Sequence, residues 1–144
     1  MTAKEHGERP GLRALLKLAG LKVTPVRMEI LDYLVEAGHP LSHAEIHSAL
    51  PGMDRVTIYR TLTAFTETDI AHQIQGPDGS WRFCAHERSF EGCPGNHPHF
   101  LCESCGRMVC LLDQHMPRVE VAEGDIVKSK QFVLHGKCSE CARQ

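Results

Sequence analysis

Two pairs of cysteines dominate the chemistry available to this 144-residue chain. Cys102 and Cys105 form one Cys-x-x-Cys pair, and Cys138 and Cys141 form another. Each pair places two sulfur atoms on one tight turn, and two such turns can supply the four thiolates of a tetrahedral zinc site. Because 32 residues separate the pairs, more than in a zinc ribbon, we expect a structural Zn²⁺ that holds the end of the chain against an earlier strand.

A Cys-x-x-Cys pair can also be a redox centre. That motif normally opens a helix within a strand-helix-strand unit, and the sequence predicts no such unit here. A thiol redox protein is therefore the alternative from a different functional class.

A second group of potential ligands lies between residues 72 and 110. The chain has seven cysteines and ten histidines, and an odd number of thiols without a secretory signal favours metal binding over a disulfide framework. The group consists of His72, Cys84, His86, Cys93, His97, His99 and Cys110. Cys84 and Cys110 could instead be buried apolar thiols.

His97 and His99 flank Pro98. We expect both rings to reach a common site only if the proline distorts the strand alternation. Otherwise the two rings serve different sites, or one of them is an ordinary polar histidine.

The first half of the chain has helical periodicity and clear boundary residues. Helices are predicted over residues 11–19, from a Thr24 cap to Gly38, from a Ser42 capping box to about residue 50, and from an Asp54 cap to residue 68. Strands at residues 70–74 and 81–84 follow and form a hairpin. This order indicates a winged helix-turn-helix, and the alternative is a plain helical domain.

Beyond Cys84 the pattern changes to short strands, predicted at residues 99–103, 107–111 and 127–135, with a possible short helix at 117–123. The sequence therefore predicts an α+β protein. The pattern predicts a winged-helix unit over residues 1–85 and a second, smaller unit over residues 97–144.

Charge is unevenly distributed, although the net charge is only -2. Residues 1–27 carry a net charge of +4, whereas residues 28–75 carry -5. Basic side chains of the first helices, among them Lys17 and Arg27, could therefore meet DNA phosphates, or they could simply be solvated. No run approaches the roughly 20 apolar residues of a membrane span, and we expect a cytoplasmic protein with no membrane partner.

These features together resemble the ferric uptake regulator superfamily of metal-sensing repressors. The resemblance covers nearly the whole chain. It rests on Gly20-Leu21-Lys22-Val23-Thr24-Pro25-Val26-Arg27, the capping-box helix, Val56-Thr57-Ile58-Tyr59-Arg60-Thr61-Leu62, the His-x-His before Cys102 and both cysteine pairs. It implies a homodimer in which the winged-helix unit (residues 1–85) is the DNA-binding domain, and its fourth helix binds palindromic, AT-rich double-stranded DNA. It also implies that residues 97–144 form a small α/β dimerisation and metal-binding domain, and that a metal at a hinge, at about 84–97, sets the spacing of the two DNA-binding domains.

The resemblance also implies roles for individual residues. Tyr59 and Arg60 would contact bases, with Thr57 and Thr61 nearby on the same helix. The regulatory metal would be held by His72, Cys84, His97 or His99, and Cys110.

Because sulfur and imidazole suit zinc better than iron or manganese, the chain most resembles the zinc uptake regulators, which repress zinc uptake genes. A regulatory Zn²⁺ is expected beside the structural one.

Some positions depart from the family pattern. Cys110 stands where relatives commonly have a carboxylate, and Pro117 and Lys130 replace ligands of a further site in the iron-sensing branch. His39 lies near a position that supplies a ligand in some relatives. The iron-, manganese- or peroxide-responsive branches of the superfamily are the alternative within the same class.

Overall fold

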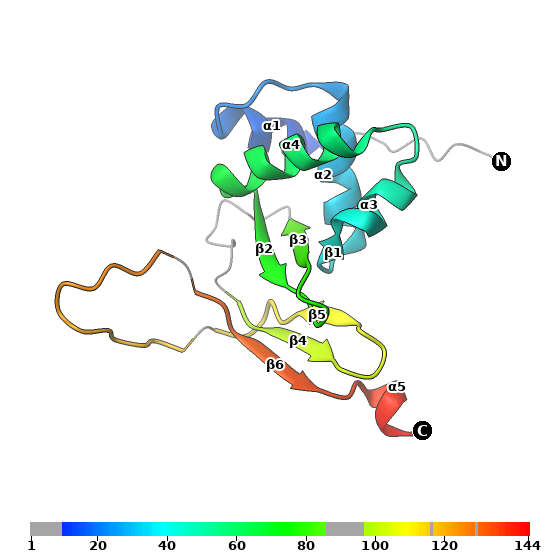
Figure 1. Cartoon of the computed structure of the whole chain (residues 1–144). Coiled ribbons are helices and arrows are strands. Elements are labelled where there is room, and N and C mark those ends of the chain that lie inside the picture. The colour runs from blue at the N-terminus through cyan, green and yellow to red at the C-terminus, as the bar shows by residue number, and fades with distance from the viewer. Residues whose placement is uncertain (1–9, 86–96, 116, 129) are drawn as a thin grey trace.

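The computed structural model describes residues 10–85, 97–115, 117–128 and 130–144. Figure 1 shows a helical unit at the N-terminal end, a small sheet beneath it and a second sheet that carries the C-terminus. The elements are, in order, α1 (Pro10–Leu18), α2 (Pro25–Ala37), β1 (Leu41–Ser42), α3 (His43–Ala49), α4 (Arg55–Glu67), β2 (Ala71–Gln75), β3 (Trp81–Ala85), β4 (His99–Cys102), β5 (Met108–Cys110), β6 (Val133–Gly136) and α5 (Ser139–Ala142).

The helix boundaries follow the predicted caps. The Thr24 side chain accepts a hydrogen bond from the backbone N–H of Arg27, and Gly38 ends α2 with a left-handed φ of 66°. At α3 the Ser42 oxygen and the Glu45 carboxylate each accept a bond from the other's backbone N–H, so the capping box is present. These contacts satisfy N–H groups that the first turns leave without helical partners.

The helical unit has its own apolar core. Side chains from α1, α2, α3 and α4 meet there, and most of them are completely buried. The largest are Leu12, Leu15, Leu16, Ile30, Leu31, Leu34, Ile46, Ile58, Leu62 and Phe65. This core positions α4 on the outside of the unit, with one face buried and the other free.

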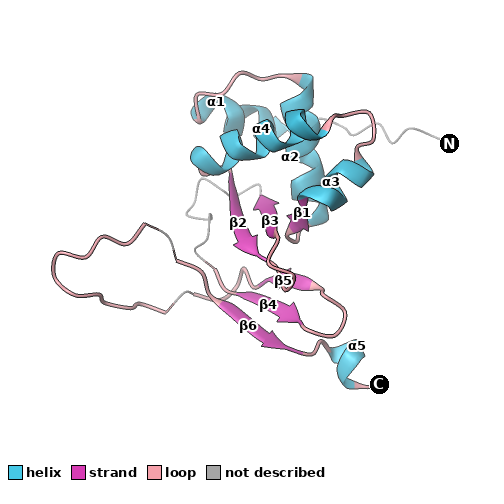
Figure 2. Ribbon diagram, viewed as in Figure 1, coloured by secondary structure: helices cyan, strands magenta, loops and turns pink. Residues whose placement is uncertain are grey.

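The predicted hairpin is confirmed as β2 and β3, which are antiparallel neighbours. The short strand β1, which the sequence did not predict, pairs with the other edge of β3, and the sheet order is β1-β3-β2. Four helices and this sheet form the expected winged-helix arrangement (Figure 2).

The second sheet has the order β5-β4-β6, with β4 antiparallel to β5 and parallel to β6. The predicted strand at residues 127–135 is confirmed only at its end, because β6 begins at Val133. The predicted helix at residues 117–123 is wrong, since these residues adopt no regular structure. Val119 and Val121, which are β-branched, disfavour a helix there, and both are exposed.

The two sheets pack face to face. Ile74 of β2 is buried against Leu101 of β4 and Met108 of β5, with Val133 of β6 partly buried beside them. At the edge of this contact, Arg82 donates a hydrogen bond from Nη1 to the carbonyl oxygen of Gly106, at 3.2 Å. The winged-helix unit and the second unit therefore have a defined relative position. The expected α+β class is confirmed.

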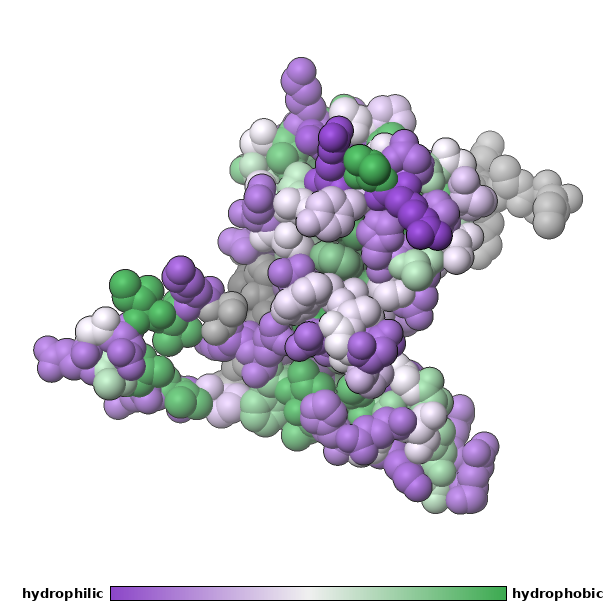
Figure 3. Space-filling view, in the orientation of Figure 1, coloured by the Kyte–Doolittle hydropathy of each residue, from purple (hydrophilic) through white to green (hydrophobic). Residues whose placement is uncertain are grey.

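The segment between β5 and β6 projects from the body of the protein, at the left of Figure 1. Figure 3 shows hydrophobic side chains on this projection. Val119, Val121, Ile126 and Val127 are all at least half exposed, which is costly for large apolar side chains. Within the described residues, no helix is long and apolar enough to span a membrane.

Candidate metal centres and DNA-facing helix

The four cysteines of the two Cys-x-x-Cys pairs come together as predicted. Their sulfur atoms lie within 4.8 Å of one another. Cys102 ends β4 and Cys105 follows on the adjoining turn, while Cys138 caps α5 and Cys141 lies within it. Cys105 Sγ and Cys138 Sγ are 3.9 Å apart, close to the roughly 3.8 Å edge expected for sulfurs bound tetrahedrally to one zinc. The donor set therefore fits Zn²⁺.

Hydrogen bonds prepare part of this cluster for a cation. The backbone N–H of Cys138 donates to Cys102 Sγ at 3.2 Å. This bond, followed by a backbone hydrogen bond from Cys105, is the main reason why the pKa of Cys102 is lowered to about 6. The hydrogen bond with Cys138 has the opposite effect on Cys141, whose pKa is raised to about 12. Hydrogen bonding within the cluster therefore favours the thiolate form of Cys102 and the thiol form of Cys141, and metal binding requires thiolates.

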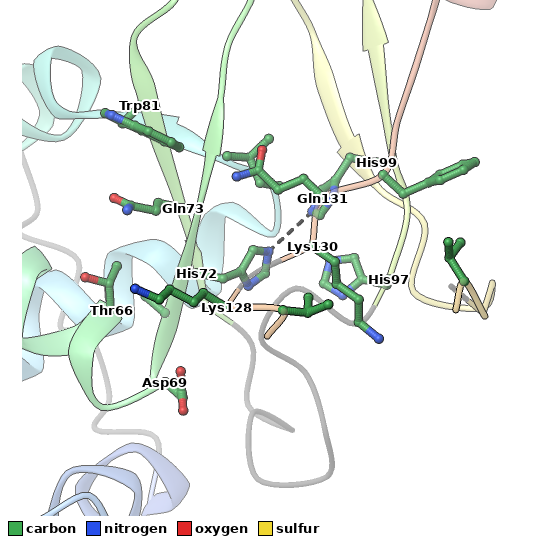
Figure 4. Close-up of a pocket in the computed structure, with 15 residues that line it drawn as sticks. Thr66, Asp69, His72, Gln73, Trp81, His97, His99, Lys128, Lys130 and Gln131 are labelled. Atoms are coloured by element: carbon green, nitrogen blue, oxygen red, sulfur yellow. Dashed lines mark hydrogen bonds between the residues drawn. The ribbon is translucent and has the colours of Figure 1, made fainter. Parts of the chain in front are cut away.

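Three histidines form a second cluster. His72, His97 and His99 are all buried, and each offers a ring nitrogen within 4.8 Å of the others. The Nε2 atoms of His72 and His99 are 3.3 Å apart, matching the roughly 3.3 Å edge of two nitrogens bound tetrahedrally to zinc. In Figure 4 these three rings face one another.

The expectation that His97 and His99 diverge unless Pro98 distorts the strand was wrong. Residues two apart in extended backbone share a face, and the two ring centroids lie 4.5 Å apart. The spacing itself could have revealed this.

Cys84 and Cys110 meet beside the histidines. Their Sγ atoms are 3.2 Å apart, but they lie outside the group of three histidine nitrogens that are within 4.8 Å of one another. Strand register explains the arrangement, because His72 pairs with Cys84 across β2 and β3, and His99 pairs with Cys110 across β4 and β5. Two cross-strand His/Cys pairs, one from each sheet, therefore face each other.

The two His/Cys pairs offer four donors, the number that a tetrahedral zinc ion needs, and His97 offers a fifth donor. The two thiols suit Zn²⁺ better than a metal that prefers oxygen. For all four donors to share one ion, the two sulfurs would have to separate by about 0.6 Å to reach a tetrahedral edge and also move closer to the histidine nitrogens. The three histidine nitrogens already lie close enough together to share an ion, and the two thiols beside them are donors of a type that Zn²⁺ accepts.

A cleft of about 670 Å³ leads to the histidines. Asp69, Lys128 and Lys130 also line it, and Figure 4 shows the two lysines beside the rings. Lys128 and Lys130 therefore place two cationic side chains at this cleft.

The structure does not bring every candidate ligand to this site. His39 is exposed and lines a separate cleft, near Arg82 and Cys105. His86 and Cys93, with the expected hinge between residues 86 and 96, lie outside the described residues.

The outer face of α4 carries the predicted DNA-binding side chains. Tyr59 is 64% exposed, Arg60 is exposed and Thr57 is half-buried. Thr61 does not share this face, because it is only 7% exposed and its hydroxyl donates to the carbonyl of Thr57 at 2.8 Å. Its expected contact with DNA is corrected because of this burial, since a side chain that is almost fully covered by protein offers little surface to DNA.

The two basic residues predicted to meet DNA lie in α1 and α2. Lys17 is exposed at the end of α1. Arg27 is half-buried and donates to the carbonyl of Lys22 at 2.9 Å.

Residues 18–140 match the profile of the Ferric uptake regulator family. The Peroxide operon regulator of Bacillus subtilis (strain 168) is 31% identical over 141 residues, which cover 90% of each chain. The Peroxide-responsive repressor PerR of Staphylococcus aureus (strain NCTC 8325 / PS 47) is 32% identical over 143 residues, 89% of this chain and 87% of the relative.

Solved structures share the fold. The Vibrio cholerae ferric uptake regulator matches with a TM-score of 0.61 and 22% identity, over 88% of this chain and 98% of that one. A zinc uptake regulator complexed with zinc and DNA matches with a TM-score of 0.63 and 19% identity, over 91% and 90% of the two chains.

Proposed function

This chain belongs to the ferric uptake regulator family, and we propose that it is a zinc-responsive repressor of zinc uptake genes. Members of the family are DNA-binding transcriptional regulators that respond to metals, and they are not enzymes. The choice of zinc rests on one observation, the two His/Cys pairs that face each other across the two sheets.

The first zinc ion would be structural. Cys102, Cys105, Cys138 and Cys141 would hold it, joining the end of β4 to α5. All four of these ligands belong to the second unit, so the ion would stabilise that unit rather than link it to the winged-helix unit.

The regulatory zinc would bind between the sheets. His72 and Cys84 would be its ligands from the winged-helix unit, and His99 and Cys110 its ligands from the second unit. His97 lies in the same cluster. It would either take the place of His99 as a ligand or hold the other histidines in position. Bound there, the ion would supply a cross-link between donors of the two units.

The exposed face of α4 would enter the major groove. Arg60 can donate two hydrogen bonds to a guanine, and Tyr59 can contact a thymine methyl group. Thr57, Arg27 and Lys17 would contact phosphates or neighbouring bases, whereas buried Thr61 is left out of the proposed contacts.

Family members bind DNA as dimers, and the half-sites would form a palindromic, AT-rich operator. The exposed valines and isoleucine of the projecting segment would be covered by the second copy of the chain, because their burial removes large apolar side chains from water. The relative position of the two α4 helices would then depend on the sheet-to-sheet contact in each protomer.

Zinc and DNA would be thermodynamically coupled. We expect zinc to bind most tightly when the two winged-helix units of the dimer are spaced to match the two operator half-sites. Zinc then raises DNA affinity by the same factor by which DNA raises zinc affinity. Typical couplings amount to about 5- to 150-fold.

The test is operator affinity measured by fluorescence anisotropy over a buffered zinc series. The duplex would be palindromic and AT-rich, and metal analysis would follow the structural zinc. We expect affinity to rise with zinc in the wild type, and Cys84→Ser and His99→Ala to need more zinc while keeping the structural ion. His135→Ala is the matched control, since His135 pairs with Leu101 in the same sheet but is exposed. A wild type whose DNA affinity ignores zinc refutes the proposal.

The second candidate is a peroxide-responsive regulator, which the names of the 31–32% identical relatives favour. It predicts that iron or manganese, rather than zinc, supports operator binding, and that peroxide then abolishes it. The same anisotropy series with each metal separates the two candidates. The sulfur content of the site argues for zinc, because iron(II) and manganese(II) prefer more oxygen ligands.

A further inference from the structure

One contact between the two units involves two thiols rather than a thiol and an imidazole. Cys84 Sγ on β3 and Cys110 Sγ on β5 lie 3.2 Å apart. None of the cysteines in the described part of the chain forms a disulfide. A disulfide bond is about 2.0 Å long, so the sulfurs would approach by about 1.2 Å to form one.

The surrounding structure holds these sulfurs in position from both sides. Cys84 is fixed by its pairing with His72, and Cys110 by its pairing with His99. Along the same strands, Ile74 packs on Leu101 and Met108, and Arg82 bonds to Gly106. These contacts do not involve the thiols, so they keep the pair together when no metal is bound.

The two thiols differ in access. Cys84 is completely buried, whereas Cys110 is partly exposed. Because oxidation of cysteine depends on access as well as on reactivity, we expect a small oxidant to react with Cys110 before Cys84. Cys84 lies behind it, at the distance of a resolving thiol.

We propose that Cys84 and Cys110 form an oxidation site, which a hydroperoxide converts into a disulfide between the two units. Cys110 sulfur attacks the peroxide O–O bond and becomes a sulfenic acid, releasing an alcohol, or water when the oxidant is hydrogen peroxide. Cys84 sulfur then displaces the hydroxyl group as water and forms the S–S bond. Two thiols and one hydroperoxide thus yield one disulfide, one alcohol and one water, with the peroxide reduced by two electrons.

The reaction would switch the proposed regulatory site off. A disulfide removes both sulfur ligands, so oxidised protein would lose its response to zinc, and a dithiol reductant would restore it. Zinc would in turn protect the thiols by occupying them. Only this mutual exclusion rests on the proposed function, because the oxidation itself needs just the two sulfurs and the peroxide.

The experiment treats the full-length dimer with hydrogen peroxide after mild chelation has emptied the regulatory site and left the structural zinc in place. A Cys93→Ser background removes the one cysteine outside the described residues. We expect loss of two thiols per chain, a Cys84–Cys110 linked peptide in the mass spectrum, and full reversal by dithiothreitol. Zinc at ten times its dissociation constant should slow the reaction about 11-fold, since about one site in eleven stays empty.

Single variants test the order of attack. In Cys84→Ser, the sulfenic acid on Cys110 should accumulate and react with dimedone, whereas in Cys110→Ser the buried Cys84 should stay reduced. A cross-link between chains, a cross-link to the Cys102 cluster, or no linked peptide at all would overturn the oxidation site. If the Cys84–Cys110 peptide forms equally fast with zinc present, the oxidation site stands and the proposed zinc ligands are wrong.

Discussion

Replacing Ile74 with alanine tests whether the packed sheets prepare the regulatory site. Ile74 is 2% exposed and contacts Leu101 and Met108 of the second unit. The substitution removes three carbon atoms, worth about 2.4 kcal/mol at ~0.8 kcal/mol for each buried methylene, and the residual cavity places the total at roughly 2–5 kcal/mol. If the whole 2.4 kcal/mol destabilises the arrangement in which the two sheets pack together, and only that arrangement binds the regulatory zinc, zinc affinity falls by up to about 60-fold.

The assay combines urea unfolding with zinc binding by competition against a chromophoric chelator. Ile46→Ala is the matched control, because Ile46 is equally buried but lies in the helical core. Both variants should lose stability, and only Ile74→Ala should also lose affinity for the regulatory zinc. Equal zinc affinity in the two variants would refute the idea that this contact positions the ligands.

Three further outcomes follow from local contacts. Arg60→Ala should weaken operator binding by about 1–3 kcal/mol without changing zinc affinity, as anisotropy and chelator competition would measure; unchanged DNA binding would remove Arg60 from the interface. Thr24→Ala should lower the unfolding free energy by about 1 kcal/mol, because the hydroxyl that caps α2 is lost, and an unchanged urea midpoint would contradict this. The backbone N–H of Thr57 donates a hydrogen bond to the Asp54 carboxylate and lowers its pKa in the folded protein. The ionised carboxylate therefore stabilises the fold fully above its ordinary pKa of 3.8. This stabilisation is lost as the pH falls through the lower pKa of the folded state. The stability advantage of wild type over Asp54→Asn should therefore shrink with acid, and a constant difference would argue against the cap.

Local features were predictable because their causes are local. Ser42 and Glu45 satisfy backbone groups only a few residues away, so a capping box can be read without any tertiary contact. The two strands of the hairpin, β2 and β3, are likewise separated in the chain only by their connecting turn. Both predictions were confirmed.

The predictions that failed concern two segments: one forms a strand only by pairing with a distant part of the chain, and the other has no surface to pack against. Strand β1 has two residues and exists because it pairs with β3, some forty residues later. The segment at 117–123 was predicted as a helix from its ending glycine, but it lacks an apolar surface to pack against in the described protomer, and most helical stability comes from such packing.

The four cysteines of the two Cys-x-x-Cys turns illustrate what sequence alone determined about this protein. Their spacing specified a common ligand set, because each pair is close in the chain and only one long-range contact was needed to join them. The regulatory site is different. Its donors come from four strands, and only the stacking of the two sheets brought His72 to His99 and Cys84 to Cys110. That stacking depends on the burial of Ile74, Leu101 and Met108, a non-directional apolar contact that leaves no motif in the sequence.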